Sequence, residues 1–275
     1  MHQKWSTRFF GIAAALLLAA CGSQNTQEAA SQPSATADNP AQKDWPTYLV
    51  ATEASYAPFE FRDENGLIIG YDVDVLTAIG QDQGFKVQFI NHAWDGIFDT
   101  LYTGERAIVA AGVLASDERK QQHTLSDPYA TTPDLIVYMD KNLNLKSFEA
   151  LKDVKTATQV NTTRIDNLIK LKGGNADVVG MPTLYLALKE LVAGNVQAVV
   201  GDAAVLRYYM QGEPSIDFQS YEYNPGANIQ EVAFVMKKGN TELQSKVNTG
   251  LRNIRANGTY DKINEKWFGK AVTAN

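Results

Sequence analysis

The sequence predicts an α/β fold built from two units in succession. From Trp45 onward, short apolar runs alternate with stretches of helical periodicity, which is typical of βαβ units with a mainly parallel sheet. The alternation runs through the folded part twice, in units of roughly 90 residues each. Further helical patterns follow the second unit, and we expect this helical tail to pack on one of the two units.

The first unit shows the alternation most clearly. Its apolar runs predict strands over 48–51, 86–90 and 107–111. A helix is expected over 71–81 and a short one over 94–102. Gly84 and Gly104 follow these two patterns, as expected where a helix ends.

The second unit repeats the pattern with different spacing. Strands are expected over 135–138, 154–159 and 196–200, and helices over 147–151, 162–171 and 182–193. A further strand is expected over 232–236. The tail then places Leu243, Val247, Leu251 and Ile254 on one face of a long helix, which a final helix follows.

The composition excludes several classes of function. Lys and Arg number 25 against 31 Asp and Glu, the net charge is −6, and no basic run occurs. We therefore expect no nucleic-acid partner. Three histidines without acidic or sulfur ligands at metal spacing predict no metal site. No phosphate-binding loop or nucleophile motif occurs, so no cofactor and no catalytic residue is expected.

The N-terminus predicts export and anchoring. Residues 1–20 are expected to form a signal peptide, because a basic start precedes an apolar run over 9–20 that is too short to span a bilayer. The run ends in Leu-Ala-Ala-Cys, which resembles the lipobox of bacterial lipoproteins, so Cys21 is the expected lipidation site. A plain signal peptide with a chance cysteine is the alternative. Residues 21–44, rich in Ser, Gln, Ala and Asn, predict a lipidated flexible tether.

The segment 110–129 carries the strongest signal for a binding site. It begins as the end of an apolar strand, turns at Gly112 and places Ser116 and Arg119 in a short polar turn. A guanidinium beside a hydroxyl at the carboxyl end of a strand suits a carboxylate. A surface arginine in a charged turn is the alternative.

Other candidate residues also follow expected strands. Glu53 and Tyr56 lie after the first strand, where they could accept hydrogen bonds from a ligand or stack on it. Trp94 lies at a strand-to-helix junction, with core packing as the alternative. Thr163 and Asp202 stand where helices begin, so they could bind an anion and a cation, respectively, or serve only as helix caps.

Short motifs also occur in a fixed order: 53–61 with 70–74, Trp-Asp-Gly at 94–96, 112–119, Ser-Asp-Pro-Tyr at 126–129, Val-Val-Gly-Asp at 199–202, and 258–260 with Lys-Trp-Phe-Gly at 266–269. Over about residues 48–270 they resemble the extracytoplasmic solute-binding proteins of bacterial polar amino-acid ABC transporters. The resemblance implies a two-lobed periplasmic-binding-protein fold of type II with two hinge strands. Lobe 1 would comprise 45–131 plus 226–275, and lobe 2 would comprise 132–225.

The resemblance also implies how the ligand backbone is held. Arg119 would bind the α-carboxylate, with support from Ser116 and from Thr163 of lobe 2. Asp202 would pair with the α-ammonium, helped by the Gly112 carbonyl. A buried zwitterion needs both charges matched, which agrees with this division.

The remaining roles concern the ligand side chain. The resemblance implies that Tyr56 and Trp94 sandwich it and that Glu53 meets its polar end. Leu114 departs from the family pattern, since many relatives carry Ser or Thr there. Leu supplies only its backbone N–H and makes that wall more apolar.

The function implied is a lipid-anchored receptor at the extracytoplasmic face that delivers a polar amino acid to an ABC permease and ATPase. We expect a monomer that binds cystine or cysteine, because sulfur packs well on aromatic rings and the motifs look most like the cystine-binding branch. Glutamine, histidine or a basic amino acid remain alternatives. So do a prephenate-dehydratase-like enzyme on the same fold, and a sensor or adhesin without a permease.

Overall fold

The structure is a computed structural model that describes residues 44–223 and 230–269. The expected signal peptide, Cys21 and all but the last residue of the expected tether lie outside the described residues. Within the described ranges, no helix has the length and apolar character needed to cross a membrane.

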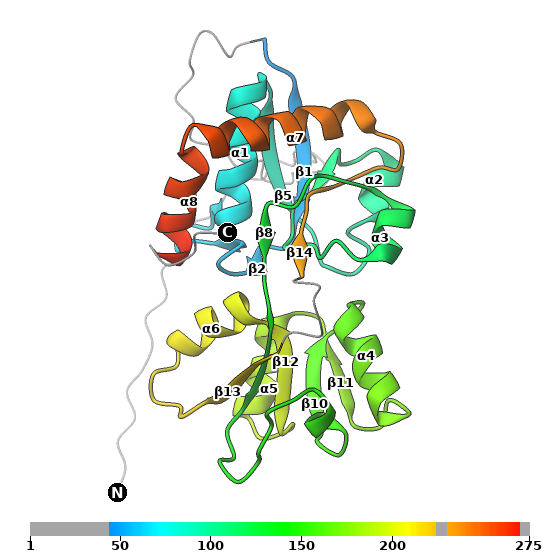
Figure 1. Ribbon diagram of the computed structural model, residues 1–275, viewed down its shortest axis with the longest axis vertical. Helices are drawn as coiled ribbons and strands as arrows, with labels where there is room; N and C mark the ends of the chain where they lie inside the picture. The colour runs from blue at the N-terminus through cyan, green and yellow to red at the C-terminus, as the bar shows by residue number, and fades with distance from the viewer. Residues whose placement is uncertain (1–43, 224–229, 270–275) are drawn as a thin grey trace, which may run out of the picture. The chain divides into compact units, whose positions relative to one another are not determined.

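The first sheet has the strand order β5-β1-β6-β15-β7, with bounds Lys86–Asn91, Thr47–Thr52, Ile108–Val109, Val235–Met236 and Thr124–Leu125. Strand β1 pairs in parallel with β5 and β6, whereas β15 runs antiparallel to β6 and β7. The same half of the molecule in Figure 1 contains α1 (Tyr71–Gln83), α2 (Asp99–Thr103), α3 (Asp117–Gln122), α7 (Thr241–Ala256) and α8 (Thr259–Phe268).

The second sheet has the order β11-β10-β12-β9-β13, with bounds Val178–Met181, Thr156–Gln159, Ala198–Asp202, Asp134–Tyr138 and Gln219–Tyr223. Strand β10 pairs in parallel with β11 and β12, and β9 runs antiparallel to β12 and β13. Helices α4 (Thr163–Lys172), α5 (Leu184–Val192) and α6 (Ala203–Gln211) accompany this sheet (Figure 1). A single 3₁₀ turn, Glu149–Leu151, stands where a short helix was expected.

Two short strands connect the two sheets. β8 (Ala130–Thr131) leaves the first sheet, and β14 (Glu231–Val232) returns to it. They pair antiparallel, with Glu231 opposite Thr131, and run between the two halves in Figure 1. A small three-stranded sheet of β2 (Ser55–Tyr56), β3 (Glu60–Arg62) and β4 (Ile68–Ile69) follows β1.

The structure corrects the expected sheet topology. Each large sheet contains two parallel and two antiparallel pairings, so neither is mainly parallel. The antiparallel strands follow the two crossings of the chain between the sheets. β9 is the strand by which the chain enters the second sheet, and β15 is the strand by which it re-enters the first sheet. The expected strand over 232–236 is divided into β14 and β15. The expected helix over 94–102 shortens to α2 because Gly96, at φ 74°, holds the preceding residues in a turn.

The helical tail packs on the first sheet's helices. Gly250 of α7 approaches Ile79 of α1 so closely that an added Cβ would lie 2.8 Å from the Ile79 Cγ2. From α8, Lys266 Nζ and Trp267 Nε1 donate hydrogen bonds to Asp74 Oδ2 of α1, at 2.6 and 2.7 Å. The apolar face of α7 thus completes the core around α1, as its periodicity predicts.

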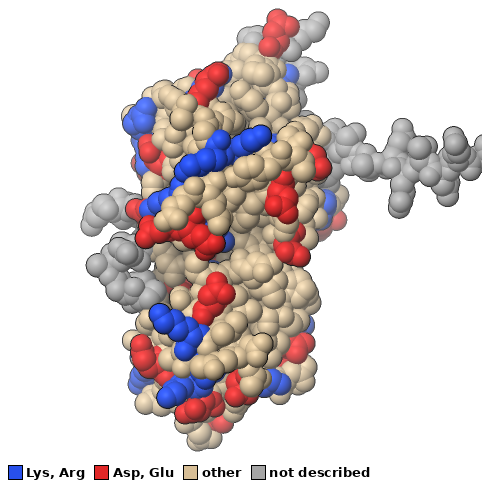
Figure 2. All heavy atoms as spheres, turned by 90° about the vertical axis from the view of Figure 1, so that its right-hand side faces the viewer, with Lys and Arg blue, Asp and Glu red and all other residues tan. Residues whose placement is uncertain are grey.

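On the face that Figure 2 shows, basic side chains lie among acidic ones in both halves. A diagonal row of basic side chains crosses the upper half with acidic side chains beside it, and the lower half carries both signs (Figure 2).

Candidate functional site

A small cavity lies where the loops after β1, β5 and β6 meet the carboxyl end of β10 and the start of α4. Its volume is about 20 Å³, enough for about one water molecule. An amino acid can therefore enter only when the walls move apart. Seven of the nine expected site residues line it, namely Glu53, Tyr56, Trp94, Gly112, Leu114, Arg119 and Thr163, together with Ala111, Gln159, Thr162 and Arg164.

Arg119 is held in the cavity wall by its neighbours. It lies in the first turn of α3, and its Nη1 donates a hydrogen bond to the Leu114 carbonyl at 3.0 Å. Its guanidinium carbon lies 5.2 Å from the Trp94 ring centroid and 5.4 Å from that of Phe98. Burial and the charge of Arg164 lower the pKa of Arg119 to about 10. The group therefore stays charged at neutral pH and keeps N–H donors for an anion.

Glu53, in the loop after β1 of the first sheet, contacts the end of β10 in the second sheet. Its Oε2 accepts a hydrogen bond from Gln159 Nε2 at 2.8 Å, and its Oε1 accepts one from Ser55 Oγ at 3.2 Å. The side chain is only 4% exposed. Burial raises the pKa of Glu53 to about 7, although the two hydrogen bonds oppose this shift. Glu53 can therefore gain or lose a proton near neutral pH.

We expect Glu53 to make the protein less stable as pH rises. A carboxyl whose pKa is about 7 in the fold and 4.5 unfolded binds more protons when folded, so the free energy of unfolding falls as pH rises from 4.5 to 7. The fall from this group is on the order of 2–3 kcal/mol. Urea unfolding at pH 5 and pH 7 measures it, and Glu53→Gln should reduce the difference by that amount. An unchanged difference in the variant would assign the pH dependence to other groups.

Asp72 and Glu60 are two further buried carboxyl groups whose pKa is raised. Asp72 lies next to Gly112, which lines the cavity. Asp72 Oδ2 accepts a hydrogen bond from the Gly112 N–H at 3.0 Å, and burial raises the pKa of Asp72 to about 6. Burial also raises the pKa of Glu60 well above its usual range. Gly112 itself has φ 55°, and an added Cβ would lie 2.7 Å from Tyr56 Cε1. Only glycine allows this close approach of the backbone to the tyrosine ring.

The two aromatic residues expected to hold a side chain both line the cavity. Tyr56 is 5% exposed and stacks on Phe59, with ring centroids 6.0 Å apart. Trp94 is 6% exposed, and its Nε1 donates a hydrogen bond to the Asn161 carbonyl at 3.1 Å. The Trp94 ring also contacts the Arg119 guanidinium, so it positions the cationic group as well as forming an apolar wall.

Asn161 makes a second hydrogen bond across the mouth of the cavity. Its Nδ2 donates to Asp95 Oδ1 at 2.8 Å, next to the Trp94 contact. Its backbone has φ 54°, a left-handed conformation that asparagine adopts more readily than most residues. These two contacts join the loop after β5 to the loop before α4.

We expect Asn161→Gly to weaken ligand binding by about two- to tenfold, which corresponds to one hydrogen bond. Glycine keeps the left-handed backbone but removes the bond to Asp95, which joins the loop after β5 to the loop before α4. Calorimetric titration measures the change. Asp95→Asn, which retains an oxygen acceptor, is the matched control and should lose less. Equal affinity in wild type and Asn161→Gly would show that this contact does not contribute to ligand binding.

Two expected site residues do not line the cavity. Ser116 caps α3, since its Oγ accepts a hydrogen bond from the Arg119 N–H at 3.3 Å. Asp202 is fully buried at the end of β12, and its Oδ1 accepts hydrogen bonds from Thr132 Oγ1 at 2.6 Å and from Ala204 N at 3.0 Å. Asp202 Oδ2 has no hydrogen-bond partner among the described residues. Asp202 therefore caps α6, and its second oxygen lies 4.0 Å from Arg164 Nη2 without a hydrogen bond.

Sequence reasoning missed Gln159 and Arg164 as cavity residues. Gln159 ends β10, and a polar residue at the carboxyl end of a parallel strand is a signal that could have found it. Arg164 follows Thr163 in the first turn of α4. A cation is disfavoured there by the helix dipole, so its presence was itself a sign of buried anionic partners.

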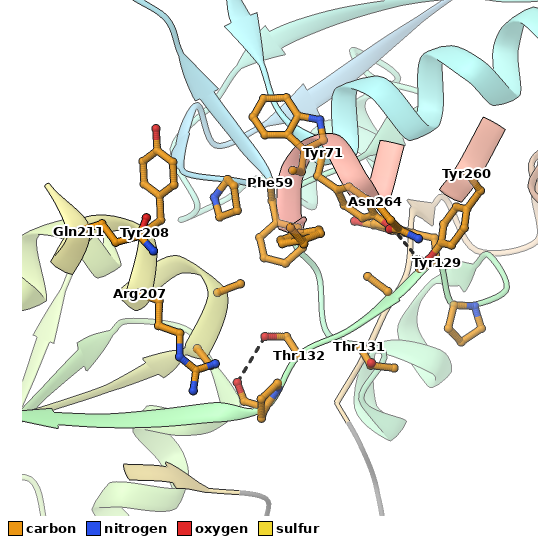
Figure 3. Close-up of a pocket in the computed structure, with 18 of the residues that line it drawn as sticks. Phe59, Tyr71, Tyr129, Thr131, Thr132, Arg207, Tyr208, Gln211, Tyr260 and Asn264 are labelled. Carbon is orange, nitrogen blue, oxygen red and sulfur yellow. Dashed lines mark hydrogen bonds between the residues drawn. The ribbon is translucent and has the colours of Figure 1, made fainter. Parts of the chain in front are cut away.

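Two larger hollows lie nearby. One of about 750 Å³ shares Trp94, Arg119, Thr162 and Thr163 with the small cavity and also includes Ser116, so it forms the approach to the site. Another, of about 480 Å³, is lined by α6, α8 and the segment around β8, including Phe59, Tyr129 and Tyr208 (Figure 3), and contains none of the expected site residues. No cluster of three or more His, Cys, Asp or Glu able to hold a metal ion occurs within 44–223 and 230–269.

Comparison with known proteins identifies the family. The model of the bacterial extracellular solute-binding proteins, family 3, matches residues 48–270. A Neisseria gonorrhoeae protein named "Probable histidine-binding protein" is 33% identical over 98% of this chain and 96% of its own. The L-cystine-binding protein TcyA of Bacillus subtilis is 29% identical over 96% of this chain and 97% of its own.

A solved structure agrees with these sequence matches. The arginine-, lysine-, histidine-binding protein ArtJ from Geobacillus stearothermophilus is 32% identical, with a TM-score of 0.76, over 82% of this chain and 97% of its own. All three relatives are named as binding proteins, and the expectation of a protein without enzymatic activity is confirmed. The chain belongs to the bacterial extracellular solute-binding proteins of family 3.

Proposed function

We propose that this substrate-binding protein of an amino-acid ABC transporter holds a polar L-amino acid between Arg119 and Asp202. One observation carries the proposal. The cavity wall contains a charged guanidinium with spare donors, and Asp202 keeps a buried oxygen without a hydrogen-bond partner among the described residues. A ligand with one carboxylate and one ammonium would satisfy both groups.

The surrounding residues would complete the ligand's backbone contacts. Thr163 lies in the cavity wall at the first turn of α4, where backbone N–H groups and the helix dipole favour a carboxylate. Ser116 would act through Arg119, because its hydroxyl caps the helix that carries the guanidinium. The Gly112 carbonyl would accept from the ammonium, while the Gly112 N–H donates to Asp72 Oδ2.

For the ligand side chain we propose cystine or cysteine. Tyr56 and Trp94 supply aromatic surfaces in the cavity wall, and sulfur packs favourably on such rings. The apolar Leu114 adds to this wall, and Glu53 would meet a polar end. TcyA, whose name states L-cystine binding, supports this choice, whereas other relatives are named for histidine and arginine.

We further propose that the chain forms two lobes around this site and works as a monomer. Lobe 1 would comprise 45–131 plus 226–275, and lobe 2 would comprise 132–225, with β8 and β14 as the hinge strands. A ligand bridging Arg119 and Asp202 would favour the closed arrangement by its differential affinity for it. The closed protein would then deliver the ligand to the permease and ATPase.

A thermal-shift screen with the common amino acids plus L-cystine tests the proposed ligand. A ligand at about 100 times its Kd stabilises the fold by roughly 2.7 kcal/mol, which shifts the melting temperature by several degrees. We expect the largest shift with L-cystine or L-cysteine. A larger shift with another amino acid would replace the proposed ligand, and no shift with any of them would refute the proposed function.

We propose that Cys21 carries a lipid that anchors the protein at the extracytoplasmic face after removal of residues 1–20. Cys21→Ser should abolish labelling by radioactive palmitate and shift the protein from the membrane to the soluble fraction. Fractionation with an antibody to the protein measures this. A variant that remains membrane-bound would contradict lipid anchoring through this residue.

A further inference from the structure

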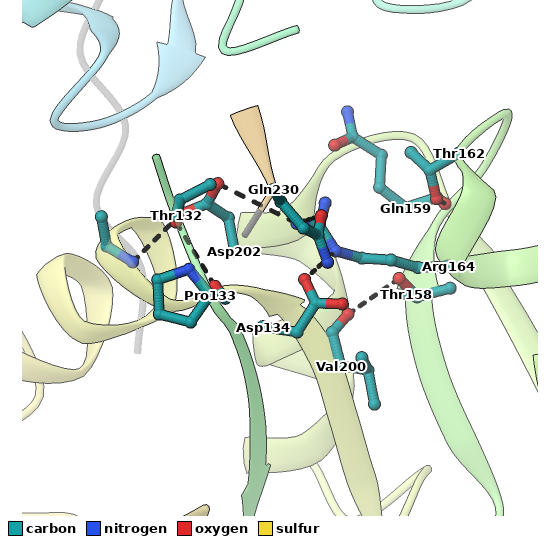
Figure 4. A network of polar contacts seen from close by, with 11 residues as sticks. Thr132, Pro133, Asp134, Thr158, Gln159, Thr162, Arg164, Val200, Asp202 and Gln230 are labelled. Carbon is teal, nitrogen blue, oxygen red and sulfur yellow. Dashed lines mark hydrogen bonds and ion pairs between the residues drawn. The ribbon is translucent and has the colours of Figure 1, made fainter. Parts of the chain in front are cut away.

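Arg164 is a buried cation in an unfavourable place. It lies in the first turn of α4, where the helix dipole disfavours positive charge, and it is only 6% exposed. Its Nε donates a hydrogen bond to Asp134 Oδ1 at 2.5 Å, and its Nη2 donates one to Gln230 Oε1 at 3.3 Å. Figure 4 shows the guanidinium directed between these groups and Asp202.

Two carboxylates keep this guanidinium charged. Asp134 pairs with it directly, and its Nη2 lies 4.0 Å from Asp202 Oδ2. Burial alone would lower the pKa of Arg164, but Asp134, Tyr56 and Asp202 outweigh burial and raise it above its usual range. The chain thus supplies its own cation to a pair of buried carboxylates.

This cation also faces the ligand site. Arg164 and Arg119 both line the small cavity, whereas Asp134 and Asp202 do not. Among the described residues that line the cavity, Glu53 alone has a carboxyl group, and both of its oxygens already accept hydrogen bonds. A ligand side chain in this cavity therefore meets two guanidinium groups and one carboxyl that is already hydrogen-bonded.

We propose that Arg164 is a specificity-determining residue that excludes amino acids with cationic side chains from the site. The inference rests on the proposed function and narrows its ligand class to neutral or acidic amino acids. Arg119 would be matched by the ligand's own α-carboxylate. A cationic side chain would lie against the Arg164 guanidinium, which lines the cavity whereas its carboxylate partners do not; with little water to screen it, this repulsion is costly. Discrimination between similar ligands commonly comes from such a repulsive element.

Replacing Arg164 should remove the preference for neutral over cationic ligands. Without the guanidinium, the buried carboxylates of Asp134 and Asp202 lack a cationic partner, and a ligand guanidinium or ammonium could supply one. The same site would then admit arginine or lysine.

Calorimetric titration of the full mature protein with L-arginine, L-lysine, L-glutamine and L-cystine tests this. In wild type, we expect the tighter of the two neutral ligands to bind at least about tenfold better than either cationic one. Arg164→Gln should reduce this ratio at least about tenfold. Arg164→Lys, which keeps a cation, should retain the exclusion. Arg207→Gln, which removes an exposed arginine paired with Glu222, is the matched control and should leave the ratio unchanged.

A double variant keeps the inference testable if the single variant does not fold. If Arg164→Gln does not fold, Arg164→Gln with Asp134→Asn replaces the ion pair by two amides and should still lose the exclusion. Wild-type binding of arginine or lysine as tight as that of the neutral ligands would overturn the inference, as would an unchanged ratio in the folded variant. In either of these two results the protein still binds an amino acid, so the proposed function would stand. Binding of no amino acid at all would overturn the proposed function and this inference together.

Discussion

Arg119→Ala is expected to weaken binding of the amino-acid ligand by about 100-fold or more, because truncating one partner of a buried charge pair costs roughly 2–5 kcal/mol. The variant should still fold. The side chain contributes one hydrogen bond, to the Leu114 carbonyl, and contacts with the Trp94 and Phe98 rings, each worth about 1 kcal/mol. Isothermal titration calorimetry measures the affinity and thermal unfolding measures the stability.

The control for this experiment is a matched arginine away from the cavity. Arg207→Ala removes an exposed guanidinium that pairs with Glu222 and should leave affinity unchanged. If Arg119→Ala binds the ligand as tightly as wild type while remaining folded, the carboxylate is held elsewhere and the assignment of Arg119 is wrong.

Asp202→Asn is expected to have an effect of similar size on binding. The amide retains an oxygen that can accept from Thr132 Oγ1 and Ala204 N, so the cap of α6 is largely preserved. It removes the negative charge that would pair with the ligand ammonium and that attracts Arg164. We expect an affinity loss of about 100-fold, again by calorimetry.

Asp217→Asn serves as the control, since Asp217 is an exposed carboxylate that pairs with Lys141. It should bind the ligand like wild type. If Asp202→Asn loses melting temperature but keeps ligand affinity, Asp202 is a helix cap and part of the Arg164 network only. The ammonium would then need another acceptor, and Glu53 is the carboxyl group in the cavity wall.

Much of the fold was predictable because most elements have a strong local signal. The helices α1, α5 and α7 have apolar faces, and β1 and β9 contain the apolar runs 48–51 and 135–138. The strand β13 was missed because its sequence, Gln-Ser-Tyr-Glu-Tyr, contains no aliphatic residue and its side chains are mostly exposed. The antiparallel orientation was missed for β9 in the second sheet and for β15 in the first. It depends on neighbouring strands that are distant in sequence.

The site was predictable in part for the same reason. Arg119, Glu53 and Trp94 follow strands whose carboxyl ends meet, so their proximity follows from topology. Arg164 pairs with Asp134, 30 positions away, and Asn161 contacts Asp95 across 66 positions. No local pattern encodes such contacts. Asp202 also shows the limit of sequence reading, because one carboxylate both caps α6 and keeps an oxygen without a hydrogen bond to any described residue.

A crystal structure of the protein with its tightest amino-acid ligand tests the central claim most directly. We expect the ligand's α-carboxylate at about 3 Å from the Arg119 guanidinium and its ammonium at about 3 Å from Asp202 Oδ2. The ligand side chain should lie between Tyr56 and Trp94. A ligand bound in the 480 Å³ hollow between α6 and α8, or one whose carboxylate contacts Arg164 instead of Arg119, would contradict the account.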